Sequence, residues 1–358
     1  QSKSQKKLYI IIKYIWIIKN LKSMIKKFLL KILTKHRIEQ YIINKTKINK
    51  IKKESYKNQV HKFGNKNKNK TFYVIQREGK GGLFSNLLLV LNHLLYCDKM
   101  KFIPVIDFKN FPTVYSEYNE NSWEYYWEPV SKYSLDEVYK SNRVIFCNEN
   151  KRTTRYFKNI KKKHLLVFKK YIKIKPYIIS EAEKFLKKNK FNKKKWIGLH
   201  WGGGDKKKAP NHPFPPIKKQ ITNLLNRYSK NKIIFVYVEE FKNFNYLKKK
   251  YKNIVFIDTF RSKNPNGPHF DHKLYYGKRN YFKYTRDVFI QALIISKLDL
   301  FIGGSSNVSE VIKYLFNKKI KYINIDNGIN HKRLLYSFFL WKLKSLLPYT
   351  LGGFKNFK

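Results

Sequence analysis

The stretch KKKWIGLHWGGGDKKKAP, residues 193–210, runs from an apolar segment through three glycines into a group of lysines. Its apolar part, residues 195–201, has the length and composition of a buried β-strand. Glycines directly after a strand let the backbone approach a ligand closely, and neighbouring lysines favour an anion. The spacing of a Walker phosphate-binding loop is missing, so the stretch does not predict an ATPase. A diphosphate-binding turn and a solvent-exposed hinge loop are both compatible with it.

Short apolar strands alternate with longer helical segments on both sides of this stretch. This alternation predicts an α/β fold with a doubly wound parallel sheet, in which ligands bind beyond the carboxyl ends of the strands. The expected strands are residues 71–76, 101–107, 195–201, 232–240, 253–260, 299–304 and 321–326.

Composition divides the chain into four parts. Residues 1–70 form a basic, apolar segment followed by a lysine-rich linker, and its apolar runs are too short to cross a bilayer. This segment could form an amphipathic helix on a membrane surface or a helix packed on the rest of the protein. Residues 71–190 are expected to form a first Rossmann-like domain and residues 191–330 a second. Residues 331–358 are expected to form a final amphipathic helix.

The net charge of the chain is +55, from 78 lysines and arginines against 23 aspartates and glutamates. Either a biased nucleotide composition or a polyanionic partner would explain it, such as nucleic acid, anionic lipid or a phosphorylated substrate. The lysines are spread along the whole chain, which favours the first explanation. An apolar content of 42% excludes a disordered protein. Cys97 and Cys147 form no disulfide framework or metal motif.

Two further polar turns lie between an expected strand and an expected helix. The first contains Gly81 and Gly82, but Phe84 stands where a third glycine would complete a dinucleotide-binding pattern. The second, GGSSNVSE at 303–310, offers serines and an asparagine as helix caps, and their hydroxyls and amides also suit an anion. Together with the glycines at 202–204, these turns predict a nucleotide diphosphate between two α/β lobes.

Four segments carry a resemblance to a known family: GGLFSNLLLVLNHLLYCDKMKFIPVIDF (81–108), SWEYYWEPVS (122–131), IGLHWGGGDK (197–206) and DLFIGGSSNVSEV (299–311). In order and spacing across residues 71–316, the chain resembles the α1,6-fucosyltransferases and their bacterial relatives that fucosylate nodulation factors. These belong to the fucosyltransferases of GT-B fold, which have two facing Rossmann-like domains. The SWEYYWEPVS segment is the most specific match.

The resemblance implies a metal-independent, inverting transfer of fucose from GDP-fucose to a glycan or lipid-linked saccharide, without a cofactor. Asp205 or His212 would be the catalytic base. The acceptor side would include Gly81, Gly82, Asn86, Trp123 and Glu124. The donor would be bound by His200, Gly202, Gly203, Gly204, Lys206, Asp287, Gln291, Ser305, Ser306 and Asn307.

The chain departs from the family pattern where an arginine is expected to hold the leaving phosphate, because Gly202 and Gly203 stand there. Lys206, its two neighbouring lysines or Arg261 are candidate replacements. Another sugar-nucleotide donor, an inactive relative and a basic nucleic-acid-binding protein are therefore alternatives, although no specific nucleic-acid motif is present. We expect a cytoplasmic protein with peripheral contact to anionic membrane, or a Golgi protein if the source is eukaryotic or viral.

Overall fold

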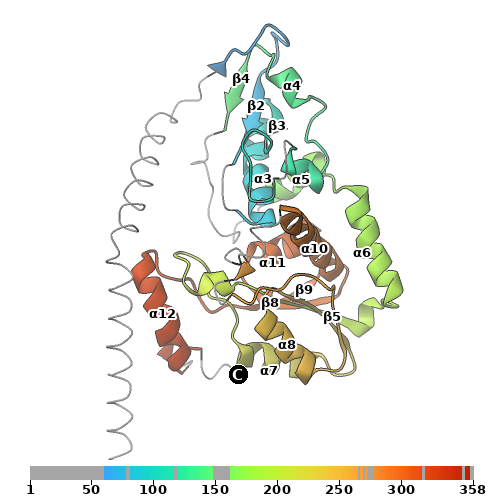
Figure 1. The fold of residues 1–358 in the computed structure, drawn as a ribbon, viewed down its shortest axis with the longest axis vertical. Coiled ribbons are helices and arrows are strands. Elements are labelled where there is room, and N and C mark those ends of the chain that lie inside the picture. The colour runs from blue at the N-terminus through green and yellow to red at the C-terminus, as the bar shows by residue number, and fades with distance from the viewer. Residues whose placement is uncertain are drawn as a thin grey trace, which may run out of the picture. The chain divides into compact units, whose positions relative to one another are not determined.

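The computed structural model describes residues 60–77, 81–116, 120–147, 162–264, 267–268, 271, 278–316, 319–348 and 351–354. The expected N-terminal amphipathic helix lies outside these residues. Residues Gln59–Lys358 form one compact unit, and it contains two β-sheets with helices around them (Figure 1). The expected α/β class is confirmed. No helix in the described ranges is long and apolar enough to cross a membrane.

The first sheet has four strands in the order β1-β4-β2-β3. Strand β2 is parallel to both β3 and β4, while β1 runs antiparallel to β4. Because β1 lies within the stretch expected to be a linker, that stretch contributes to the sheet. The strands are β1 (Val60–His61), β2 (Phe72–Ile75), β3 (Ile103–Ile106) and β4 (Val144–Phe146).

Helix α3 (Leu83–Met100) connects β2 to β3. It starts after Gly82 and ends at Lys101, whose φ of 57° lies in the left-handed region that stops a helix. Most of its apolar residues are buried, because the helix packs between the first sheet and the helices of the second.

The second sheet has five parallel strands in the order β7-β6-β5-β8-β9. In chain order this is a 3-2-1-4-5 arrangement, which reverses direction between β5 and β8, as in doubly wound folds. Figure 1 shows α7 and α8 on one side of this sheet and α10 on the other. The strands are β5 (Trp196–Trp201), β6 (Ile233–Val238), β7 (Ile254–Val255), β8 (Leu300–Gly304) and β9 (Lys321–Ile325).

All six residues of β5 are buried, because both faces of the sheet are covered. Leu199 faces the apolar cluster made with α7 and α8, whereas Gly198 lies against α10. A Cβ at Gly198 would lie only 3.0 Å from Leu298 and 3.1 Å from Ile295, so glycine allows this close approach.

The remaining helical segments have the following bounds: α4 (Leu135–Val138), α5 (Lys162–Tyr171), α6 (Pro176–Lys188), α7 (Lys218–Tyr228), α8 (Phe241–Lys250), α10 (Lys278–Ser296), α11 (Asn307–Val311) and α12 (Leu334–Leu346). Short 3₁₀ turns are η1 (Ser122–Tyr125), η3 (Lys193–Lys195) and η4 (Gly204–Lys207), and a π-helical turn, η6 (Ile312–Phe316), follows α11.

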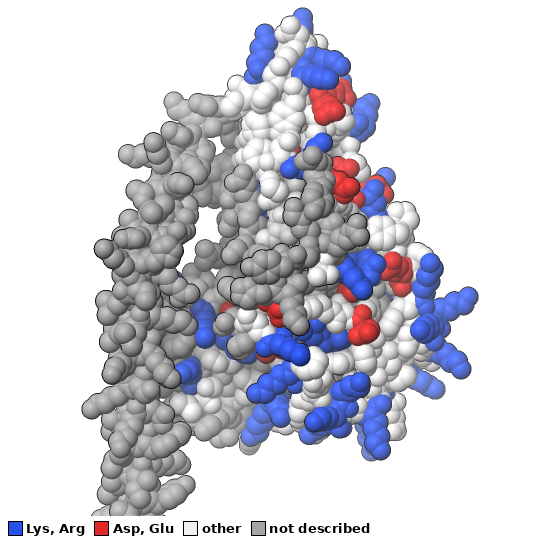
Figure 2. Space-filling model, in the orientation of Figure 1, with Lys and Arg blue, Asp and Glu red and all other residues white. Residues whose placement is uncertain are grey.

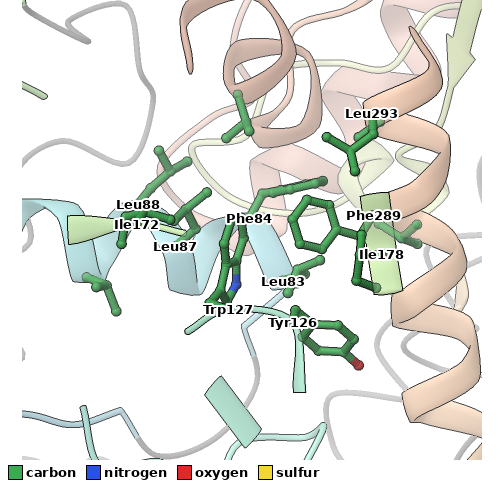
Figure 3. Close-up of a cluster of buried hydrophobic side chains, with 14 of the residues drawn as sticks. Leu83, Phe84, Leu87, Leu88, Tyr126, Trp127, Ile172, Ile178, Phe289 and Leu293 are labelled. Carbon is green, nitrogen blue, oxygen red and sulfur yellow. The ribbon is translucent and has the colours of Figure 1, made fainter. Parts of the chain in front are cut away.

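One apolar core joins the two sheets (Figure 3). Phe289 of α10 lies 4.5 Å from Trp127 and 5.8 Å from Phe84 of α3, measured between ring centroids. Tyr126 donates a hydrogen bond to the carbonyl of Phe282 at 3.2 Å. The aromatic residues of the SWEYYWEPVS segment therefore supply much of the contact between the sheets.

Strand β7 covers only two residues of the strand expected at 253–260. The guanidinium of Arg261 donates to the carbonyls of Ile257 at 2.8 Å and Thr259 at 3.0 Å. These two carbonyls bond to a side chain and not to β6. The segment pairs again only at Ser262, which forms a bridge with Glu240 just beyond the end of β6. The apolar pattern alone could not have predicted this early end.

Candidate functional site

The polar turns after β5, β6 and β8 meet at one edge of the second sheet. His200 of β5 pairs with Tyr237 of β6 on one side and with Gly303 of β8 on the other. Since all three strands are parallel, their carboxyl ends lie at the same edge, where the strand order reverses. The turns gathered there contain Gly202, Gly203, Gly204, Asp205, Glu239, Glu240, Ser305, Ser306 and Asn307.

The positions of two glutamates explain why the turn after β5 consists of glycines. A Cβ at position 202 would lie 2.5 Å from the carboxyl carbon of Glu239, and one at position 204 would lie 2.3 Å from Glu240 Oε1. Between them, Gly203 has a φ of 94°, which residues with side chains rarely adopt. The Gly203 N–H donates to Glu239 Oε2 at 2.9 Å. The space that a side chain at 202 would need is therefore filled by the Glu239 carboxylate.

Only 15% of the Glu239 side chain is exposed. Burial would raise its pKa, but His200, Lys206 and the Gly203 N–H stabilise the charged form and lower the pKa to about 2. His200 Nε2 faces the carboxylate at 3.7 Å, which is longer than a hydrogen bond. In the described structure this buried nitrogen has no hydrogen-bond partner.

His200 is fixed from its other side by the turn after β8. Its Nδ1 lies 3.4 Å from Ser309 Oγ, and its ring lies 4.6 Å from that of Tyr237. Ser309 Oγ in turn donates to the Gly304 carbonyl at 2.8 Å. His200 thus links β5 to the first turn of α11, which follows β8.

Ser306 caps α11, as the sequence predicts, because its Oγ accepts from the Ser309 N–H at 3.1 Å. The side chain of Ser305 bonds to Asn324 of β9, with the Asn324 Nδ2 donating at 3.0 Å. Asn307 is the first residue of the helix. Asn324 had no signal in the sequence, because its role depends on β9 lying beside β8.

The lysines after the glycine turn differ in their environment. Lys207 pairs with Glu240 at 3.3 Å, so its ammonium is already engaged. Burial raises the pKa of Glu240, and Lys207 opposes this shift. The charge of Lys206 acts on Glu239, as noted above. Asp205 is the second residue of η4, and its backbone nitrogen lies 3.1 Å from where a Cβ on Gly267 would be.

The other candidate base, His212, lies beyond η4. Its Nδ1 is 2.8 Å from the Pro210 carbonyl, and its own carbonyl accepts from the Asn330 N–H at 2.8 Å. Its segment is therefore attached to the chain just before α12. The geometry leaves Asp205 and His212 both as candidates.

Asp287 and Gln291 are buried on successive turns of α10. The Gln291 Nε2 donates to the Asp287 carbonyl at 3.1 Å, and Arg286 Nη2 lies 3.1 Å from Asp287 Oδ1. The Gln291 Oε1 is buried without a hydrogen-bond partner in the described structure. These contacts hold the two side chains within their own helix.

Arg261 is engaged elsewhere. Besides its two bonds to backbone carbonyls, its guanidinium stacks 3.7 Å from the Phe244 ring. Burial lowers its pKa, which the nearby Asp258 and Asp287 oppose. In the described structure the Arg261 guanidinium is therefore held by two backbone carbonyls and the Phe244 ring.

Gly81, Gly82 and Asn86 lie where the first sheet faces the second. The Asn86 Oδ1 accepts from Arg77 Nη1 at 2.7 Å, and a Cβ at Gly81 would lie 2.6 Å from the Arg77 guanidinium carbon. Tyr115 Oη is 3.8 Å from where a Cβ on Gly82 would be. Arg77 escaped the sequence analysis, although its position two residues after β2 was a usable signal.

Tyr115 lies between the charges of the two sheets. Burial raises its pKa most, Arg77 from the first sheet lowers it, and Glu239 from the second raises it further. Its ring packs 6.1 Å from that of Tyr281 on α10. Charged groups from both sheets therefore act on this tyrosine, which lies beside the turn with Gly82.

Trp123 and Glu124 border a groove of about 570 Å³ beside β3. Trp123 is buried and stacks on Trp127 at 5.5 Å, whereas Glu124 is exposed and accepts from Asn121 at 2.9 Å. The groove is lined by β3 and by residues 120–136, a different part of the chain from the turns of the second sheet. Trp123 also lines a small cavity together with Asn86 and Tyr115, so it lies close to the turn with Gly82, whereas Glu124 borders the groove.

Comparison with known proteins gives likeness in structure alone. No family model matches the chain, and no curated protein matches it. Fucosyltransferase NodZ from Bradyrhizobium is 11% identical, with a TM-score of 0.48, and the match covers 74% of this chain and 100% of that one. NodZ α-1,6-fucosyltransferase co-crystallized with GDP is 12% identical, with a TM-score of 0.48 and coverage of 72% and 96%.

POFUT1 in complex with GDP is 13% identical, with a TM-score of 0.40, and the match covers 72% of this chain and 99% of that one. At identities this low and with TM-scores below 0.5, the function of this chain has to be inferred from its own residues.

Proposed function

We propose that this chain is a glycosyltransferase of GT-B architecture that transfers fucose from GDP-fucose to a glycan acceptor, with inversion and without a metal ion. The observation that carries the proposal is that the turns after β5 and β8 lie at the same edge, where the strand order reverses, and that His200 of β5 contacts Ser309 of α11 there. This is the place where doubly wound sheets bind nucleotides. The choice of fucose and guanine in this proposal rests on the sequence resemblance.

In the proposed reaction, Asp205 or His212 takes the proton of the acceptor hydroxyl, and this oxygen attacks the anomeric carbon of fucose. The bond to the diphosphate oxygen breaks in the same step through an oxocarbenium-like state. The backbone amides of the glycine turn and Lys206 stabilise the charge that develops on the departing GDP. The serine turn before α11 supplies further donors to the phosphates.

Glu239 imposes a condition on this proposal. Its carboxylate accepts the Gly203 N–H, which is one of the amides offered to the diphosphate. A diphosphate and a buried carboxylate at the same amide would repel each other strongly. We therefore infer that donor binding displaces the Glu239 carboxylate from the glycine turn.

The proposal is tested by incubating the protein with GDP-fucose and measuring release of GDP, with and without a chelator. A panel of other nucleotide sugars, run in parallel, separates the fucose donor from the alternatives. If neither GDP nor any other nucleoside diphosphate shifts the melting temperature, the nucleotide site is wrong. Binding without turnover would identify an inactive relative.

The condition on Glu239 gives a second test. Replacing Glu239 by Gln removes the negative charge and is expected to tighten GDP binding roughly tenfold, because the repulsion disappears. Isothermal titration with GDP measures the effect. Glu181→Gln on α6, a half-exposed carboxyl paired with Arg286, is the matched control and should leave the affinity unchanged. Weaker binding by the Glu239→Gln variant would show that the carboxylate contacts the ligand favourably.

The charge of the chain does not by itself favour nucleic-acid binding. Figure 2 shows lysines and arginines scattered over the visible face, with acidic residues among them in the upper part. A nucleic-acid interface would instead gather basic residues in one stripe or patch. A steep salt dependence of binding to random DNA, without any nucleotide-sugar binding, would reverse this preference.

A further inference from the structure

Helix α12 presents an apolar face to the outside of the protein. Tyr336, Leu343 and Leu346 are 56%, 54% and 65% exposed. Their spacing places them on one side of the helix. Surface helices of soluble proteins usually carry polar residues on the outer side, so the apolar outer side of α12 departs from that pattern.

The inner side of α12 is fixed to the body of the protein. Trp341 lies 5.7 Å from the ring of Phe214 and 5.1 Å from that of Phe354. Ser337 is fully buried and donates to the His331 carbonyl at 2.7 Å. The apolar outer face is therefore held in place by an anchored helix.

The exposed apolar surface continues beyond the helix. Ile329 precedes it and is 50% exposed, and Leu351 follows it and is 67% exposed. The turn containing Leu351 is attached to α12, because the Phe354 N–H donates to the Lys344 carbonyl at 2.7 Å. We call these residues together with α12 the α12 surface.

The charge of this region is of one sign. Residues 327–358 contain no aspartate or glutamate. Lys332, Arg333 and Lys342 lie exposed within or beside α12, whereas the Lys344 ammonium lies over the rings of Phe214 and Phe354 on the inner side. Apolar side chains flanked by lysine and arginine are what a helix needs to lie in the headgroup region of an anionic membrane. Each basic residue near such a surface contributes to binding.

We propose that the α12 surface binds anionic phospholipid membranes, with Tyr336, Leu343 and Leu346 entering the headgroup region and the neighbouring lysines and arginine contacting lipid phosphates. This surface is separate from the nucleotide turns, and the proposal holds whether or not the chain is a transferase.

The α12 surface is connected to the candidate site through hydrogen bonds. Asn330, just before α12, donates from Nδ2 to the Lys207 carbonyl at 3.3 Å. The Asn211 N–H donates to the His331 carbonyl at 3.2 Å. Membrane contact by α12 would therefore hold the loop after the glycine turn close to the bilayer, within reach of a lipid-linked acceptor.

An environment-sensitive fluorophore on Leu343→Cys tests the contact directly. Cys97 and Cys147 are both buried, so labelling is directed to the new thiol. With the full chain and vesicles containing phosphatidylserine, we expect a blue shift of emission at position 343. Leu166→Cys on α5, where the leucine is 58% exposed, is the matched control and should show no shift.

Unchanged emission at position 343 in vesicle-bound protein would overturn the proposal, because another part of the chain would then carry the binding. Emission already shifted without lipid would also overturn it, because a second copy or another segment of the chain would then cover α12. An equal shift of emission with phosphatidylcholine vesicles, which have no net charge, would show that lysine and arginine contacts with anionic lipid do not contribute to binding.

A vesicle sedimentation assay provides the second measurement. The double variant Leu343→Glu/Leu346→Glu is expected to bind phosphatidylserine vesicles at least tenfold more weakly, since two leucines no longer enter the interface. Lys332→Gln/Arg333→Gln should lose roughly fivefold for each charge removed. Leu166→Glu should bind like the unmodified protein. Equal binding by all four proteins would contradict the proposal.

Discussion

At the scale of single residues, the site is governed by the contact between the glycine turn and Glu239. Replacing Gly202 by Ala places a methyl group 2.5–2.7 Å from the carboxylate atoms. We expect a loss of about 1–3 kcal/mol in the free energy of unfolding, as is usual for overpacking. Gly82→Ala is the control, because the nearest atom to its new Cβ would be 3.8 Å away. Urea denaturation measures both.

A double variant shows whether this loss of stability comes from the contact with Glu239 or from a change in the turn itself. If Glu239 is responsible, Gly202→Ala should be much less harmful in a Glu239→Ala background. Strict additivity of the two substitutions would show that the carboxylate is not the group being displaced.

The lowered pKa of Glu239 also predicts a dependence of stability on pH. The pKa is about 2 in the folded protein against an ordinary value of 4.5. Because it is lowered, the ionised group stabilises the fold fully above about pH 4.5, and this contribution of about 3 kcal/mol is lost as the pH falls toward 2. Urea midpoints between pH 5.5 and 3 should therefore fall more steeply for the unmodified protein than for Glu239→Gln. Parallel curves would contradict the assigned pKa.

The parts of the site that could be predicted from the sequence are those formed by residues close together in the chain. The three polar turns were predictable, because each is a short pattern between a strand and a helix. Glu239 as the partner of Gly203 was not, since it lies 36 residues away and approaches only when β6 pairs with β5. A glycine in a sequence shows that space is limited, but it does not show which residue takes the space.

At the scale of secondary structure elements, the early end of β7 shows how a side chain can override an apolar pattern. Residues 253–260 read as a continuous strand, but Arg261 binds two of the carbonyls that would pair with β6. The strands with no such competitor, β2, β5 and β8, match their expected ranges closely. Periodicity therefore predicts where an element begins better than where a neighbouring polar group ends it.

Arg261→Lys tests this interpretation. Lysine cannot keep two separated carbonyl bonds and the stacking on Phe244 at once, so we expect a loss of about 1–3 kcal/mol in the free energy of unfolding. Arg227→Lys on α7 is a suitable control, because Arg227 is exposed and lies 5.5 Å from Tyr228. Chemical denaturation of both variants gives the comparison, and equal stabilities would show that Arg261 does not hold the segment.

At the scale of the whole molecule, the two sheets depend on one another through their shared core. The sequence predicts two separate Rossmann-like domains, because each half repeats the strand-helix pattern on its own. It does not show that SWEYYWEPVS packs on α10, because Trp127 and Phe289 are far apart in the chain. This packing makes the position of one sheet's turns relative to those of the other a property of the folded unit.

Phe289→Ala is expected to lower the free energy of unfolding by about 3–5 kcal/mol, because it leaves a cavity beside Trp127 and Phe84 where the two sheets meet. Since the core is continuous, unfolding followed by tryptophan fluorescence and by far-ultraviolet circular dichroism should still give one coincident transition. Phe244→Ala on α8 removes a buried ring from the other face of the second sheet and serves as the control. Two separate transitions in Phe289→Ala, but not in Phe244→Ala, would show that the sheets can unfold independently. The turns of the two sheets would then be held together only by the contact that Phe289 makes.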